Sequence, residues 1–394
     1  MDKPDVGELK PPERVLMGPG PSNAHPRVLS AMHTTIVGHL DPSFMDVMDE
    51  VQDLLRYVFR TENEWTLPVS GTGSASMEAA FSNLVEPGDT VLVPDNGYFG
   101  ERMASMSRRA GGEVVTVEAP WGEPLDVEDY ERALDEHQPE VVGVVHAETS
   151  TGVLQPDVPE LVDLAHDHDS YVVLDAVTSL CGVPVKVDDW DVDACYSAAQ
   201  KCISCPPGAS PLTLNDRAMD KILSRETEPR CWYLDLKELE TYWGDDRSYH
   251  HTAPVTNIFG LREALRIVAE EGIEGAWERH RRVSGAFKSG LEEMGLEMNS
   301  DDDAWLPTLN AVRVPDGVSD DVILRRLVEE YNIEVSAGLG ALEGEIVRIG
   351  CMGHSARPQN VLYLANALGD ILEDEGVDVD GGAGVAAVSE GLRE

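Results

Sequence analysis

The stretch Tyr171-Val172-Val173-Leu174-Asp175 decides the fold, because a run of strand-forming residues ends there in an acid. A helical pattern precedes it over residues 158–167, where apolar residues recur at three- and four-residue spacing. The same alternation fills residues 65–214, and the other expected strands are residues 66–70, 90–94, 113–117, 141–146, 194–197 and 211–214. This pattern predicts an α/β fold in which helices cover a mostly parallel seven-stranded sheet. Such sheets bind ligands at the carboxyl ends of their strands.

The pattern changes near Gly260. Long helical stretches over residues 261–271 and 273–294 precede short expected strands at residues 308–314, 333–336 and 346–349. We therefore divide the chain into four parts: an N-terminal arm (residues 1–25), a large domain (26–260), a smaller C-terminal α+β domain (261–374) and an acidic tail (375–394). The tail shows no clear periodicity, so we expect it to be mobile.

The charge balance is the most unusual property of the composition. Asp and Glu number 73 against 30 Lys and Arg, which gives a formal net charge of −43. A surface this negative repels phosphate backbones and anionic membranes, so we expect neither nucleic acid nor a membrane as a partner. Concentrated salt screens such self-repulsion, because the Debye length falls to about 3 Å near 1 M. We interpret the composition as salt adaptation in a halophile's cytoplasm, since no membrane helix or signal peptide is recognisable in the sequence.

The six cysteines do not form the dense pattern of a disulfide framework. Cys202 and Cys205 make a C-x-x-C pair, but no second pair and no paired histidines complete a zinc set. A redox pair is the alternative interpretation. We expect buried, reduced thiols and no metal site.

The segment Ser70-Gly71-Thr72-Gly73-Ser74-Ala75 follows an expected strand and opens an expected helix. Glycines let the backbone approach a ligand, and the free N–H groups of a helix start favour an anion, so the segment is a candidate phosphate cradle. A plain glycine turn is one alternative. A dinucleotide site is another, because the two glycines start a G-x-G-x-x-G pattern and Asp95 lies near the spacing of a ribose-binding acid, although Ser76 replaces the third glycine.

Asp175 and Lys201 are charged residues in segments that we expect to be buried, where an unpaired charge is costly. Asp175 ends a buried strand, and a buried carboxylate is costly without a positive partner such as a protonated pyridine nitrogen. Lys201 ends the small, apolar run of residues 194–200, where desolvation lowers an amine's pKa and makes it a Schiff-base nucleophile. A structural salt bridge is the alternative for each. A phosphate cradle, a strand-end acid and a lysine one strand later together predict a pyridoxal-phosphate site.

Several further motifs follow one another in order along the chain: Gly18-Pro19-Gly20-Pro21-Ser22-Asn23, N-G-Y-F-G from Asn96, H-A-E-T-S-T-G-V-L-Q-P from His146, L-D-A-V-T-S-L from Leu174, Gln200-Lys201, Y-H-H-T from Tyr249 and R-I-G from Arg348. With the cradle, they span residues 18 to about 372. In these motifs the chain resembles the alanine–glyoxylate and serine–pyruvate aminotransferases, a class V group of pyridoxal-phosphate enzymes of fold type I.

The resemblance implies a role for each matching position. Lys201 carries the cofactor and Asp175 faces its ring nitrogen. The residues expected to hold the phosphate are Thr72, Gly73, Ser74 and Gln200, with Tyr249 and Thr252 reaching in from the other subunit of a homodimer. Phe99 and Val177 flank the ring, and Thr149 lies beside the ring oxygen; many relatives have tryptophan at the position of Phe99 and serine at that of Thr149. Arg348 takes the substrate carboxylate, and the loop with Gly38 and His39 shapes the substrate pocket.

The activity implied by the resemblance is transfer of an amino group from alanine or serine to glyoxylate or pyruvate. Ureidoglycine–glyoxylate and aspartate aminotransferases of the same family are the nearest alternatives. Cysteine desulfurase needs a mobile cysteine and usually a histidine before the lysine, where this chain has Gln200. A nicotinamide dehydrogenase leaves Lys201 and the Y-H-H-T run unexplained, and a non-catalytic binding protein would be expected to lack Lys201 or Asp175.

Overall fold

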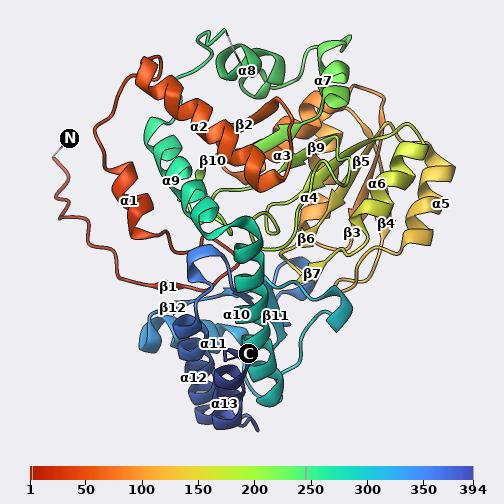
Figure 1. The fold of residues 1–394 in the computed structure, drawn as a ribbon. Helices are drawn as coiled ribbons and strands as arrows, with labels where there is room; N and C mark the ends of the chain where they lie inside the picture. The colour runs from red at the N-terminus through yellow and green to blue at the C-terminus, as the bar shows by residue number, and fades with distance from the viewer. Residues whose placement is uncertain (2, 245, 394) are drawn as a thin grey trace.

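The computed structural model describes residues 1, 3–244 and 246–393, and its centre is a seven-stranded sheet of order β2-β10-β9-β8-β5-β3-β4 (Figure 1). The strands are β2 (Trp65–Gly71), β3 (Thr90–Asp95), β4 (Glu113–Glu118), β5 (Val141–Val145), β8 (Tyr171–Asp175), β9 (Ala194–Tyr196) and β10 (Gly208–Leu214). Only β10 runs antiparallel to its neighbours. The predicted α/β fold and mostly parallel sheet are therefore confirmed.

Helices cover this sheet and bury its central strands, as the apolar runs predict. The large-domain helices are α1 (Pro26–Met32), α2 (Pro42–Phe59), α3 (Gly73–Leu84), α4 (Tyr98–Ala110), α5 (Val127–His137), α6 (Val158–Asp167), α7 (Asp216–Leu223), α8 (Leu236–Trp243) and α9 (Val255–Glu271). A short hairpin joins β6 (Ala147–Glu148) to β7 (Val153–Leu154), and the 3-10 helix η1 (Trp232–Leu234) precedes α8.

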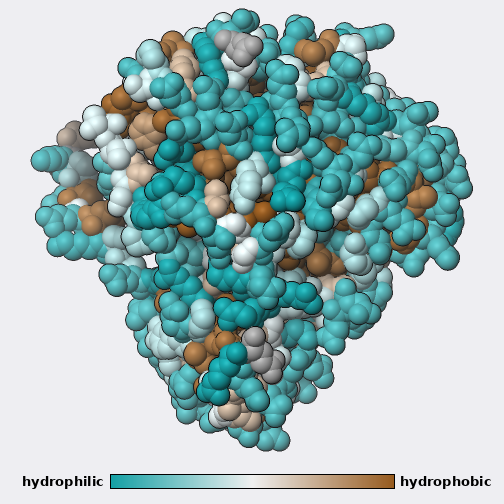
Figure 2. Space-filling view, in the orientation of Figure 1, coloured by the Kyte–Doolittle hydropathy of each residue, from teal (hydrophilic) through white to brown (hydrophobic). Residues whose placement is uncertain are grey.

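The visible face of the molecule is mostly hydrophilic, with apolar side chains in small, separate patches (Figure 2). This surface agrees with the acidic composition of the chain. Among the described helices, none has both the length and the apolar composition that a membrane span requires.

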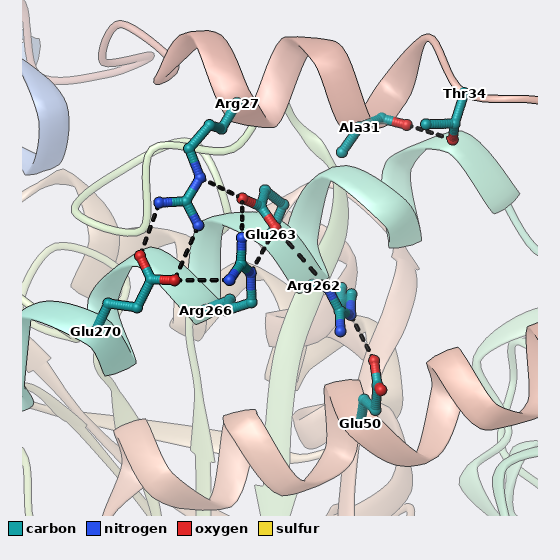
Figure 3. A network of polar contacts seen from close by, with 8 residues as sticks. All are labelled: Arg27, Ala31, Thr34, Glu50, Arg262, Glu263, Arg266 and Glu270. Carbon is teal, nitrogen blue, oxygen red and sulfur yellow. Dashed lines mark hydrogen bonds and ion pairs between the residues drawn. The ribbon is translucent and has the colours of Figure 1, made fainter.

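An ion-pair network fastens α1 and α2 to α9 (Figure 3). Arg27 of α1 binds Glu263 at 2.6 Å and Glu270 at 2.7 Å, and Arg266 also binds both carboxylates. Arg262 pairs with Glu50 of α2. The glutamate at the centre of the network, Glu263, has only 10% of its side chain exposed. The shared carboxylates fix α1 on the surface of α9 more firmly than isolated surface pairs would.

The small domain lies below the sheet in Figure 1 and has its own apolar core. Its sheet has the order β11-β14-β13, and the N-terminal strand β1 (Val15–Leu16) pairs in parallel with β12. The other elements are α10 (Ile273–Glu293), η2 (Asp302–Ala304), β11 (Leu309–Arg313), α11 (Asp320–Tyr331), β12 (Ile333–Glu334), β13 (Ser336–Ala337), η3 (Gly340–Leu342), β14 (Ile346–Gly350), η4 (Gly353–Ser355) and α12 (Pro358–Asp374).

The packing places the domain boundary later than the expected position after residue 260. Leu261 and Leu265 of α9 belong to the core of the large domain, as does Ala276 at the start of α10, whereas Val283 belongs to the small core. The helix α10 therefore passes from one core to the other. The arm also joins the small domain, because Met17 is fully buried in its core.

The expectation of a mobile tail was wrong for residues 381–391, which form the helix α13 (Gly381–Gly391). This helix packs against α10 and α12, and its Val388 is fully buried in the small core. Glycines bring the backbones close together: a Cβ on Gly384 would lie 2.7 Å from the carbonyl oxygen of Gly290. The apolar residues Val385, Val388 and Leu392 recur at helical spacing, which was the available signal.

We predict that Gly384→Ala destabilises the protein by about 1–3 kcal/mol, because the added methyl overlaps Met294 and the Gly290 carbonyl. The matched control is Gly382→Ala in the same helix, where the new methyl meets only an Asp380 oxygen at 3.5 Å. Chemical unfolding of both variants measures the difference. Equal stability of the two variants would show that α13 is not packed.

Candidate active site

The loop between β2 and α3 has the geometry of an anion cradle. Thr72 is the N-cap of α3, and its side chain makes no capping hydrogen bond, so the first N–H groups of the helix have no side-chain partner there. Gly73 begins the helix, and a Cβ at this position would lie 2.8 Å from the Cβ of Ala198. The absence of a side chain on Gly73 therefore lets the helix start lie directly on the segment that leads to Lys201.

Seven of the predicted residues line one cavity of about 140 Å³: Thr72, Gly73, Ser74, Phe99, Val177, Gln200 and Lys201. Met77, Arg102 and Ala198 complete the lining. The residues come from four separate parts of the large domain. Their convergence at the carboxyl ends of β2, β8 and β9 is the position at which α/β sheets bind ligands.

Asp175 lies buried at the end of β8 with 2% of its surface exposed. Burial raises the pKa of its carboxyl to about 6, although the carboxylate accepts hydrogen bonds from the Val177 N–H and the Tyr196 hydroxyl, each at 2.8 Å. Among residues 1, 3–244 and 246–393 no cation forms an ion pair with this carboxylate, and Lys201 acts on its pKa only through its charge from a greater distance. The site therefore stabilises the ionised carboxylate incompletely and favours a cationic ligand atom.

Asp193 is a second buried aspartate, and its charge is compensated by its contacts. Its side chain is fully buried, which alone would raise the pKa, but hydrogen bonds from His166 and the Val172 N–H and the charge of Arg217 hold that pKa below its ordinary value. The ion pair with Arg217 measures 2.8 Å. Asp175 has no such partner, so the alternative of a structural salt bridge does not hold for it.

Lys201 is buried against the N-terminal arm, with 9% of its surface exposed. Burial, followed by the charge of Arg348, lowers the pKa of its amine to about 8. The ammonium donates to the carbonyl oxygen of Pro19. The next residue, Gly20, has φ +117°, and a Cβ there would lie 2.8 Å from the lysine Cδ. Lys201 is thus held as a desolvated amine, the state needed for nucleophilic attack and proton transfer near neutral pH.

Arg348 lies on β14 of the small domain, outside the lining of this cavity, and its charge acts on Lys201. It is 6% exposed, and burial lowers its pKa to about 10. Its Nε donates to the carbonyl of Ala337 at 2.7 Å, and its Nη1 lies 3.5 Å from the carbonyl of Thr149. The Thr149 hydroxyl is hydrogen-bonded to that of Thr178. The guanidinium thus has incomplete local compensation and can bind a carboxylate.

Glu148 and Arg102 position Phe99, and the sequence analysis missed both. The Glu148 carboxylate is buried, which raises its pKa, and it accepts the Phe99 N–H at 3.1 Å. The Arg102 guanidinium lies 4.7 Å from the centre of the Phe99 ring and donates to Ser74 Oγ at 3.2 Å. The available signals were a glutamate shortly after the apolar run of residues 141–145 and an arginine one turn after Phe99.

Gly38, His39, Tyr249 and Thr252 do not line this cavity within one chain. His39 lies 5.5 Å from the Tyr249 ring between ring centres, and 62% of Tyr249 is exposed. Thr252 is exposed as well, and a Cβ on Gly38 would meet no atom within 4 Å. A hydrogen bond of 2.6 Å between His251 and Ser70 links the Y-H-H-T run to the cradle strand.

Comparison with known proteins decides the family. The family described as "Aminotransferase class-V" matches residues 15–361. The chain belongs to the class V aminotransferases. Mouse alanine–glyoxylate aminotransferase is 40% identical over 93% of this chain and 89% of its own length. The (S)-ureidoglycine–glyoxylate transaminase of Bacillus subtilis is 36% identical over 96% of this chain and 95% of its own length. A Nostoc alanine–glyoxylate aminotransferase structure superposes with a TM-score of 0.92 at 48% identity, covering 93% of this chain and 97% of that one.

The site of this class V aminotransferase fits pyridoxal phosphate. The cradle at Thr72–Ser74 matches the phosphate, because the first N–H groups of α3 have no side-chain cap there and can donate to an anion. Asp175 is a buried carboxylate that lacks a cation, which a protonated ring nitrogen would supply. Lys201 offers the amine on the same cavity. Each part of the cofactor has a chemically matched group in the chain.

We predict that the cofactor-free aminotransferase loses stability as the pH rises from about 4 to about 6, relative to Asp175→Asn. The pKa of Asp175 is raised from 3.8 to about 6 in the folded protein. Between these two pH values the unfolded chain ionises Asp175 while the folded chain keeps it protonated, so the free energy of unfolding falls as the pH rises. The difference corresponds to about 3 kcal/mol, fully developed at pH 7. Chemical unfolding at several pH values measures it.

The control is Asp193→Asn, for which the sign is opposite. The pKa of Asp193 is lowered in the folded protein, so its ionised form stabilises the fold at neutral pH and that contribution is lost as the pH falls. An Asp175→Asn variant less stable than the wild type at pH 7 would contradict our account of Asp175.

Proposed function

We propose that this chain is a pyridoxal-phosphate enzyme that transfers an amino group between a small amino acid, alanine or serine, and a small 2-oxo acid, glyoxylate or pyruvate. The observation that carries the proposal is the pairing of a buried, cation-deficient Asp175 with a desolvated Lys201 beside a phosphate cradle. The names of the mouse, Nostoc and Bacillus subtilis relatives support glyoxylate as one substrate.

The residues of the chain have separate tasks in this reaction. Pyridoxal phosphate supplies, when bound, an aromatic ring that accepts the electrons freed at the substrate Cα. Asp175 keeps a positive charge at the ring nitrogen, because a buried carboxylate stabilises a neighbouring cation. The Lys201 amine, with a pKa of about 8, removes and returns the substrate Cα proton as general base and acid. Phe99 and Val177, which line the cavity, orient the ring and exclude water from it.

Arg348 binds the carboxylate that amino acids and 2-oxo acids share. Because its charge lowers the pKa of Lys201, a bound carboxylate neutralises part of that effect and makes the lysine more basic. Substrate binding thus prepares the base for the proton transfer that follows. Arg348 comes from the small domain, so the same contact favours closure of the two domains.

Ureidoglycine and aspartate are the alternative amino donors, and the Bacillus subtilis relative supports the former. Cysteine desulfurase is a weaker alternative for a physical reason. Cys351, the thiol nearest to Arg348 in sequence, is fully buried, and burial raises its pKa to about 12. A mobile thiolate nucleophile needs exposure and a lowered pKa, which Cys351 lacks.

We propose further that the active unit is a homodimer, in which Tyr249 and Thr252 complete the phosphate site of the other subunit. Their exposure in one chain supports this, as do the exposed neighbouring aromatics Trp232 and Tyr233, at 62% and 41%. The acidic composition and the mostly hydrophilic visible face (Figure 2) support salt adaptation, and a cytoplasmic location stays a prediction from the sequence.

We predict that the protein, purified in concentrated salt with pyridoxal phosphate, shows the visible absorbance band of the lysine-bound cofactor. Alanine or serine should bleach the band, and glyoxylate or pyruvate should restore it. Lys201→Ala is the control and should bind the cofactor without forming the band. A wild-type protein that cannot be reconstituted with pyridoxal phosphate would overturn the proposed function.

We predict that Arg348→Gln lowers kcat/KM for alanine by about 10- to 100-fold, because hydrogen bonds to charged groups contribute about 1.5–3 kcal/mol. The pH profile should also shift upward, since Arg348 lowers the pKa of Lys201. Ethylamine, which has no carboxylate, is the matched control substrate. Its slow reaction should not fall by a comparable factor, and an equal loss for both amines would show that Arg348 does not bind the carboxylate.

A further inference from the structure

A second cavity, of about 180 Å³, borders the segment that follows Lys201. Cys202, Ile203 and Ser204 form part of its wall. The α9 helix contributes an apolar wall, and the remaining lining comes from the start of α1, from α10 and from residues 353–357 of the small domain. The cavity therefore lies where the two domains and the lysine segment meet, and the proposed reaction assigns no task to it.

Basic and imidazole side chains gather at this cavity in a chain of net charge −43: His25, Arg279, His354 and Arg357 all line it. Glu271 is its acidic lining residue, and Arg279 already binds that carboxylate through Nε at 2.6 Å and Nη2 at 3.0 Å. The other guanidinium nitrogen of Arg279, Nη1, donates to two backbone carbonyls. The negative charge of Glu271 is therefore already compensated.

Arg357 has no ion pair within the part of the chain that the structure describes. Its guanidinium contacts the His354 ring at 2.6 Å, and burial, followed by the charge of Arg279, lowers its pKa. A half-buried guanidinium beside a second guanidinium is unfavourable unless an anion accompanies it. Within the described residues, Arg357 is thus a cation without an ion-pair partner, whereas Asp175 is a buried carboxylate without one.

His25 supplies a directional donor to this space, whereas both ring nitrogens of His354 face Arg357 Nη2, at 2.6 and 2.5 Å. The rings of the two histidines lie 4.7 Å apart between centres. The Nδ1 atom of His25 accepts the Arg27 N–H at 3.0 Å, so a neutral His25 carries its proton on Nε2 and can donate it to a ligand. Arg27 is itself held by the network of Figure 3, which fixes the position of His25 at the start of α1.

We propose that this cavity binds a compact tetrahedral oxyanion of the phosphate class. Arg357 supplies the charge, His25 supplies a further hydrogen bond from the other domain, and His354 holds the guanidinium in place. Donors that come from separate elements suit a ligand with oxygens on all sides better than a carboxylate, whose two oxygens lie on one side. The 17-residue helix α12 begins directly after Arg357, and its positive end adds to the attraction.

Occupation of this site would fix the small domain to the lysine segment. The His354 backbone N–H donates to Ser204 Oγ at 2.7 Å, and Ser204 Oγ lies 2.8 Å from Ser22 Oγ. Ser22 Oγ donates in turn to the backbone carbonyl of Lys201 at 2.7 Å. An anion held by Arg357, which contacts the His354 ring, would stabilise this hydrogen-bonded chain, and with it the arrangement of the N-terminal arm, Lys201 and the small domain.

Calorimetric titration with inorganic phosphate tests the proposal, on the full chain loaded with pyridoxal phosphate and at constant ionic strength. We expect one phosphate to bind per chain and Arg357→Gln to weaken that binding by at least about tenfold. Arg281→Gln is the matched control, because it makes the same charge change at an exposed position of α10 and should bind as the wild type does. His354→Leu is a second test that leaves the Arg357 charge in place and should also weaken binding.

Two further titrations separate this site from its alternatives. Arg102→Gln alters the cofactor cradle and should leave phosphate binding by the loaded enzyme unchanged; a loss there together with normal binding by Arg357→Gln would assign the phosphate to the cradle and overturn the proposal. Acetate that binds as tightly as phosphate, with the same dependence on Arg357, would overturn the tetrahedral assignment. Absence of phosphate binding by the wild type would overturn the site, while the absorbance changes with alanine report the proposed transamination separately.

Discussion

A buried carboxylate without a cation, Asp175, is the constraint on which the active site depends. It ends a strand that is buried on both faces of the sheet, and burial outweighs its hydrogen bonds and the charge of Lys201, so its pKa is raised. This buried charge lies close to the lysine segment. Asp175 pairs with Tyr196 in the register of β8 and β9, and Lys201 follows β9 along the chain. The unfavourable charge becomes useful when a cationic ring occupies the site.

Lys201 depends on contacts from three parts of the chain. The arm supplies Pro19 and Gly20, the small domain supplies the charge of Arg348, and the large domain supplies the cavity. Because the arm is anchored in the small domain through β1 and Met17, movement of that domain also affects the surroundings of the lysine. Domain position and the basicity of the amine are therefore physically linked. The anion site at Arg357 would act on the same junction from the opposite side.

The convergence of seven candidate residues on one cavity could be predicted from sequence, because most of them follow strands whose apolar runs are unambiguous. Asp175 ends β8, Thr72–Ser74 follow β2 directly and Lys201 follows β9 after a short loop, and parallel strands bring such ends together. Glu148 and Arg102 were missed, since they act on Phe99 through contacts that no spacing rule reports. The α13 helix was missed because its small residues give weak periodicity, although they are what permits the close contact at Gly290.

The sequence by itself determined the order of the strands along the chain, the class of fold and the chemistry available at each strand end, because these follow from local apolar patterns and from the nature of single side chains. Only the tertiary structure decided which charges are compensated. Asp193 and Asp175 are both buried acids, yet one meets Arg217 and the other meets no cation in the described chain. Arg279 and Arg357 differ in the same way. Compensation depends on distances between residues far apart in the sequence, which local patterns do not contain.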